Sequence, residues 1–235
     1  MLFVGNNRGY TSLMMASSGG RKDLNDSPSF GKSEGNQKES AADQTQQIRG
    51  GENTQDTPPN PDEGELRRAV GLFMKFQRQQ RDHYYEVGLP IATTTKAFLT
   101  RFFDPALLGQ VRVVKMAGDR VPNPSFFKEA EEKGYKNLPD LKHLSSVTFL
   151  DVVVFNEKIV ERSLFHGLVL ATQVQVLGLE RFADLFVRGF LRAKSYFMVP
   201  LKAHAFALDC QFAENRERGF SVETEVVRWV EEGRY

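Results

Sequence analysis

Apolar positions recur at helical spacing through much of the chain after residue 62. Asp62 can cap a helix at its N-terminus, and Leu66, Val70 and Phe73 follow every three or four residues. The same periodicity, together with helix-end signals, predicts further helices over residues 90–103, 158–176, 179–193, 200–215 and 221–232.

Two other segments have the pattern of strands. Residues 111–116 alternate and are rich in β-branched side chains, and residues 147–155 are apolar on both faces, as in a strand that is covered on both sides. Between them, residues 118–139 are rich in proline and glycine and predict a long ordered loop with at most one or two helical turns. Two strands followed by several helices predict an α+β fold, mainly helical, with a small sheet.

The N-terminal part of the chain has a different composition. Residues 16–64 are polar, and their large apolar side chains are Leu24, Phe30 and Ile48. Such a segment buries too little surface to offset its ordering entropy, and a proline-rich stretch closes it. We therefore expect residues 1–62 to be a disordered polar tail and linker, followed by a single domain over residues 63–235.

Charge and cysteine content exclude some classes of partner. The formal net charge is +1, which gives no electrostatic reason to expect a nucleic acid or a membrane surface as partner. No apolar run reaches the roughly 18 residues that span a bilayer. The single cysteine, Cys210, fits a reducing compartment, so we expect a cytoplasmic location.

One segment indicates a chemistry. The helix expected over residues 158–176 contains Leu164-Phe-His-Gly-Leu-Val-Leu-Ala-Thr-Gln173. This segment resembles the zinc-binding helix of compact bacterial predicted metallopeptidases of the HExxH (zincin-like) class, whose pattern is LFHELVHxxQ. The resemblance extends over about residues 147–215, because Leu177-Gly178 and Pro200-Leu201 also match. It implies a zincin-like fold, in which a small sheet packs on a central helix that carries the metal site.

The chemistry of that family needs particular side chains. Two histidines at i and i+4 grip zinc from one helical face, a glutamate after the first histidine serves as the base, and a later acidic residue completes the site. Here His166 matches the first ligand, but Gly167 replaces the base. Leu170 replaces the second histidine, and Lys202 replaces the later acid. The chain therefore cannot run ordinary HExxH peptidase chemistry.

We interpret the chain as a pseudoenzyme of this family that binds a protein or peptide in the former substrate groove, with no cofactor. Two alternatives stay open. One is an active metal-dependent hydrolase whose zinc site is rebuilt from His166, His204, Asp209 and Cys210. The other is a purely structural domain without activity. Asp151, inside an apolar segment, is either a carboxylate of the site or an end-of-sheet residue bonded to the backbone.

Overall fold

A computed structural model describes residues 60–193 and 195–235 of the chain. The helices are α1 (Glu63–Tyr85), α2 (Thr93–Leu99), α3 (Pro105–Gln110), α4 (Phe126–Glu132), α5 (Glu161–Leu177), α6 (Leu179–Arg192), α7 (Pro200–Glu214) and α8 (Val222–Glu231). The strands are β1 (Leu89–Pro90), β2 (Arg112–Lys115), β3 (Ser146–Phe149) and β4 (Val152–Phe155). No helix of the described part has the length and apolar character to cross a membrane. The expected tail, residues 1–62, lies outside the described residues except for its last three.

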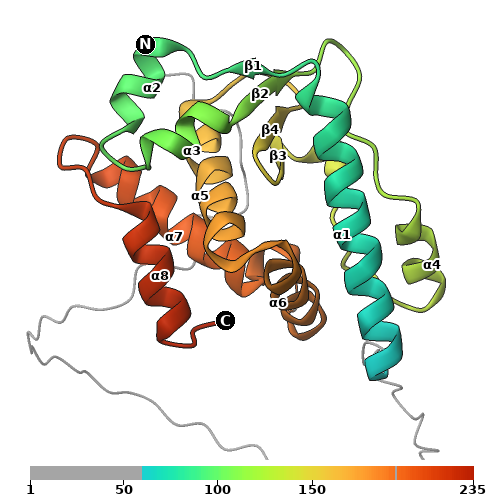
Figure 1. The fold of residues 1–235 in the computed structure, drawn as a ribbon. Coiled ribbons are helices and arrows are strands. Elements are labelled where there is room, and N and C mark those ends of the chain that lie inside the picture. The colour runs from blue at the N-terminus through green and yellow to red at the C-terminus, as the bar shows by residue number, and fades with distance from the viewer. Residues whose placement is uncertain (1–59, 194) are drawn as a thin grey trace, which may run out of the picture. The chain divides into compact units, whose positions relative to one another are not determined.

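The expected α+β fold, mainly helical with a small sheet, is confirmed (Figure 1). The strand order is β1-β2-β4-β3, so β3 lies at an edge of the sheet. β2 pairs with β4 in parallel, while β1 pairs with β2, and β3 with β4, in antiparallel fashion.

The segment over residues 147–155 was predicted as one strand, and this was wrong. The segment is a hairpin in which Phe149 pairs with Val152, so the chain reverses within Leu150 and Asp151. No glycine, asparagine or proline marks this turn, which is why the sequence pattern did not reveal it. The reversal instead places Leu150 at a φ of 55°, a left-handed conformation that bulky residues rarely adopt.

Asp151 ties this turn to α1. Its two carboxylate oxygens accept hydrogen bonds from Arg81 Nε and Nη2 at 2.8 and 2.9 Å. The guanidinium of Arg81 also lies 4.0 Å from the ring centre of Tyr85. Asp151 therefore has a structural partner on a helix, which neither sequence interpretation foresaw.

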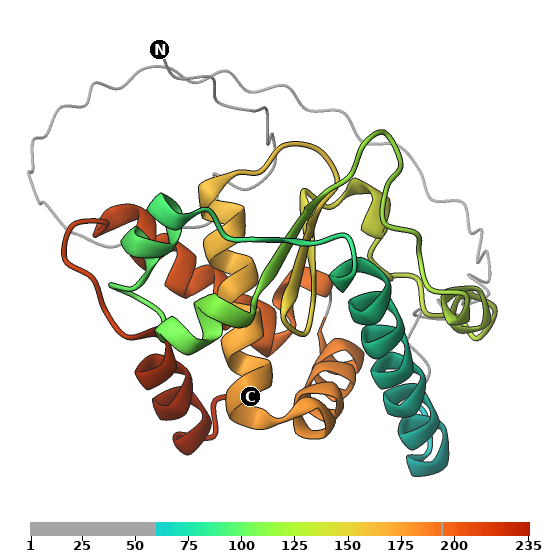
Figure 2. The ribbon, with the colours of Figure 1, turned by 45° about the horizontal axis from the view of Figure 1, so that its top comes forward.

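The sheet lies between α5 and α1, as Figure 2 shows. The period of a strand puts alternate side chains of β4 on opposite faces. Val153 and Phe155 belong to the apolar cluster around α5, whereas Val152 and Val154 belong to the cluster that includes Tyr84 of α1. The strand β4 is thus apolar on both faces because a helix covers each face of the sheet.

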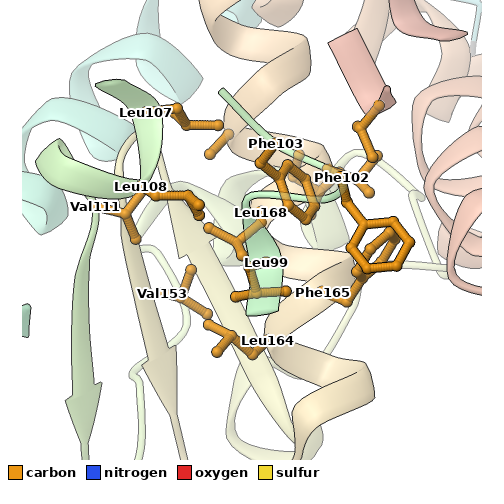
Figure 3. Close-up of a cluster of buried hydrophobic side chains, with 14 of the residues drawn as sticks. Leu99, Phe102, Phe103, Leu107, Leu108, Val111, Val153, Leu164, Phe165 and Leu168 are labelled. Atoms are coloured by element: carbon orange, nitrogen blue, oxygen red, sulfur yellow. The ribbon is translucent and has the colours of Figure 1, made fainter. Parts of the chain in front are cut away.

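The helix α5 stands at the centre of the fold and contacts β3, β4, α6, α7 and α8. Its buried face packs into a cluster with α2, α3 and β4, in which Phe165 and Leu168 lie against Leu99 and Phe102 (Figure 3). The rings of Phe165 and Phe212 stack at 4.1 Å between centroids. This aromatic packing fixes the position of α5 in the fold.

The helices after residue 158 match their predicted ranges within three residues, and the expected stop at Gly178 ends α5. The region before β2 differs. The helix predicted over residues 90–103 is only Thr93–Leu99, because Pro90 pairs with Arg112 in β1 instead of opening the helix. A further short helix, α3, follows with Asp104 as its cap.

Candidate functional site

A cleft of about 200 Å³ opens between α1, α4, α6 and the edge strand β3. Its walls are mainly apolar and include aromatic residues of three helices, namely Phe73, Phe76, Phe126, Phe127, Phe182, Phe186 and Phe190. Residues 147–150 of β3 and the hairpin turn form one side. Leu170 of α5 and Lys202 of α7, two of the positions singled out from the sequence, also line this cleft.

His166 lies directly beside Lys202. Lys202 Nζ donates a hydrogen bond to His166 Nε2 at 3.1 Å, and both side chains are buried. Burial lowers the pKa of His166 to about 4, and the charge of Lys202 adds to this effect. Burial also lowers the pKa of Lys202 to about 8. The resemblance placed these two residues in one site, and the fold brings them together.

Asp209, about two turns along α7 from Lys202, is the third polar group. Its Oδ2 lies 3.3 Å from His166 Nδ1, close enough for attraction, although the two atoms are not aligned as a hydrogen bond. Its other oxygen accepts a hydrogen bond from Arg162 Nε. Arg162 also donates to Cys210 Sγ at 3.2 Å. The order along the cluster is therefore Arg162, Asp209, His166 and Lys202.

Gly167 faces the hairpin at very short range. A Cβ built at this position would lie 2.8 Å from Val153 Cγ1 and 3.0 Å from Thr148 Oγ1. The Thr148 hydroxyl also donates to the Gly167 carbonyl, at 3.5 Å. Glycine therefore lets α5 approach the hairpin closely, and the space that a glutamate side chain would need is occupied by β3 and β4.

His204 lies away from this cluster. Its Nδ1 is 3.3 Å from Gln173 Nε2, and its ring stacks on Trp229 at 4.7 Å between centroids. Burial lowers the pKa of His204 to about 4. Within the described ranges, no three His, Cys, Asp or Glu side chains are grouped so that they could hold a metal ion. The structure thus brings His166 and Asp209 together but leaves His204 with other partners.

Several residues of the site were not found from the sequence. Arg162 binds Asp209 from the first turn of α5, and Val153 and Thr148 close the space beside Gly167. The spacing of Lys202 and Asp209, seven residues apart on one helix, was the available signal that both face the same neighbour. No comparable signal connects Gly167 to Val153, because that contact depends on the hairpin.

Comparisons with known proteins give no relative for this chain. No family model matches the sequence, and neither the curated proteins nor the solved structures contain a match.

Proposed function

We propose that this protein is a zincin-like pseudopeptidase domain that binds an extended peptide with apolar side chains in the cleft beside β3. The observation that carries the proposal is the convergence of Leu170 and Lys202 on one apolar cleft, with His166 next to Lys202. The family that the sequence resembles places its second ligand and its acidic ligand at these two positions.

The chemistry of the site favours binding over hydrolysis. Leucine offers no lone pair to a metal, and a lysine at the position of the acidic ligand opposes a dication. The close contact of Gly167 with Val153 leaves no room for a glutamate base. The polar groups that remain are therefore those of a cleft without a hydrolytic centre.

The walls of the cleft suit an extended segment. β3 is an edge strand, and a peptide can add to such an edge through main-chain hydrogen bonds. Its alternate side chains would then enter the pockets between the phenylalanines of α1 and α6. Lining residues such as Glu65, Arg68 and Lys133 are charged and partly exposed, which gives the apolar floor a polar rim.

Selection from a random dodecapeptide display library tests this function. The wild-type protein is the bait, and Leu170→Trp, which fills the cleft, is used for counter-selection. We expect enriched peptides with apolar residues at every second position that bind Leu170→Trp at least ten-fold more weakly. Val87→Trp, at a surface position 64% exposed, is the matched control and should leave affinity unchanged.

Thermal unfolding of each variant shows whether its fold is intact. Peptides that bind wild type and a folded Leu170→Trp variant equally would place the binding surface elsewhere and refute the proposal. A selection that yields no enriched peptide would refute it as well.

A further inference from the structure

Lys202 is a buried lysine without an acidic partner. Its side chain is 6% exposed, and no carboxylate of the described residues forms an ion pair with it. Its ammonium group instead lies 5.2 Å from the ring centre of Tyr196 and 5.9 Å from that of Phe206. A lysine in such surroundings is readily present as the neutral amine, the form that reacts as a nucleophile.

His166 holds this amine in a defined position. Its Nδ1 faces the carboxylate of Asp209 at 3.3 Å, which favours the tautomer that carries the proton on Nδ1. Its Nε2 is then the acceptor for Lys202 Nζ, at 3.1 Å. An amine that donates one N–H to an imidazole keeps its own lone pair available for an electrophile.

The cleft limits what can reach the amine. Lys202 lines it together with Leu170, Phe190 and Tyr196, and the whole space is about 200 Å³. An apolar cavity of roughly 150 Å³ is enough to hold benzene. The space next to Lys202 therefore suits a small apolar molecule.

We propose that Lys202 captures an apolar aldehyde as an imine in this cleft. The Nζ lone pair attacks the carbonyl carbon, and the C=O π bond breaks to give a carbinolamine. The carbonyl oxygen then leaves with the two amine hydrogens as water, while the C=N bond forms. The reaction needs no oxidant, reductant or second substrate, and His166 acts as a positioning residue.

The charges of the cleft favour an aldehyde over a keto acid. A carboxylate on the ligand would need a free cation, but Arg68 is paired with Glu129 at 3.1 Å. Lys133 is paired with Glu65 at 3.0 Å. Of the cationic side chains that line the cleft, Lys202 is the one that pairs with no carboxylate of the described residues, and it is the nucleophile itself.

Reductive labelling of the full-length protein tests this inference. The protein is incubated with hexanal and sodium cyanoborohydride, which reduces the imine to a stable secondary amine, and the labelled lysines are then mapped by peptide mass spectrometry. We expect Lys202 to be labelled at least ten-fold faster than the exposed Lys128 in the same molecule. Glyceraldehyde, a polar aldehyde, should show no such preference.

Equal labelling of Lys202 and Lys128 by hexanal, or an equal preference with glyceraldehyde, would overturn the inference. Because these measurements use the wild-type protein, they are decisive even where a variant fails to fold. In Leu170→Trp, labelling of Lys202 should fall at least ten-fold while that of Lys128 stays the same. The inference does not rest on peptide binding, since no peptide takes part in the labelling.

Discussion

The two faces of α5 differ in what their buried side chains contact. On one face, Phe165 and Leu168 are fully buried in an apolar cluster formed by leucines of α2 and α3 and the phenylalanines of residues 102–103 between them (Figure 3). Phe212 of α7 completes this cluster. On the other, His166 and Gln173 are buried as well, but they face α7 and its polar groups. The first face is apolar and closely packed, whereas the second mixes apolar walls with groups that prefer water.

This difference separates the side chains whose burial stabilises the fold from those whose burial costs free energy. Burial of an apolar side chain contributes about 2 kcal/mol, whereas burial of an unpaired polar group costs about as much. Among the described residues, His166 Nδ1 and Gln173 Oε1 are buried without a hydrogen-bond partner, and the buried Lys202 forms no ion pair with a carboxylate. Stability alone therefore does not explain the polar face, which is consistent with a role in binding.

Of the substitutions that test this comparison, Phe165→Ala should change the free energy of unfolding most. The phenyl ring stacks on Phe212 and also meets Phe102 edge-on at 5.5 Å, so its removal leaves a cavity in the apolar face. We expect a loss of about 4 kcal/mol in the free energy of unfolding, measured by urea denaturation. A loss below about 1 kcal/mol would mean that this face does not hold the fold.

Lys202→Met should change the free energy of unfolding in the opposite direction, toward higher stability. Methionine retains the length of the side chain and removes the cost of a buried amine, so we expect a gain of about 2 kcal/mol in the free energy of unfolding at pH 7. The pKa of Lys202 is lowered to about 8 in the folded state from 10.5, so the unfolded chain binds more protons between these values. The wild-type protein therefore gains stability as the pH rises from 8 to 10.5.

The stability advantage of Lys202→Met over wild type should thus disappear over that pH range, since wild type gains up to about 3 kcal/mol as the pH rises. Urea denaturation at pH 7, 9 and 10.5 measures it. Lys128→Met, at an exposed position, is the control and should show no such change with pH. A gap that stays constant with pH would show that the amine of Lys202 is solvated in the folded protein.

Gly167→Ala should have the smallest effect of the three. Alanine favours a helix by about 1 kcal/mol over glycine, but its Cβ would press on Val153 at 2.8 Å. Overpacking of this kind costs about 2 kcal/mol, so we expect a net loss of about 1 kcal/mol. In Val153→Ala the same substitution should become stabilising, and additive effects in this double-mutant cycle would contradict the close contact.

The ranges of the helices in the C-terminal half could be predicted closely from the sequence. Caps and apolar periodicity are local signals. At the start of α8, for example, the Ser221 hydroxyl oxygen accepts a hydrogen bond from Thr224 N, as in an N-terminal helix cap. The hairpin of β3 and β4 was missed because its turn relies on a strained Leu150 and on Arg81 from a distant helix. Tertiary contacts, not local preference, determine that turn.

The candidate site could be predicted only in part. The spacing on α5 and the family resemblance selected His166, Leu170 and Lys202. Of these, Leu170 and Lys202 line the cleft, and His166 contacts Lys202. His204, which the alternative zinc site would include, lies against Gln173 and Trp229 and away from His166. The packing around Gly167 depends on the distance between two elements, which a single sequence does not contain.

The contact of Gly167 with Val153 also constrains how this protein can change over evolution. A single base change can convert a glycine codon to a glutamate codon, but the new side chain would meet the two methyl groups of Val153 at once. Val153 would first have to be replaced by a smaller residue, and that substitution by itself lowers stability because Val153 is fully buried. The order of mutations therefore matters, because a glutamate at position 167 becomes tolerable only after Val153 has been replaced by a smaller residue.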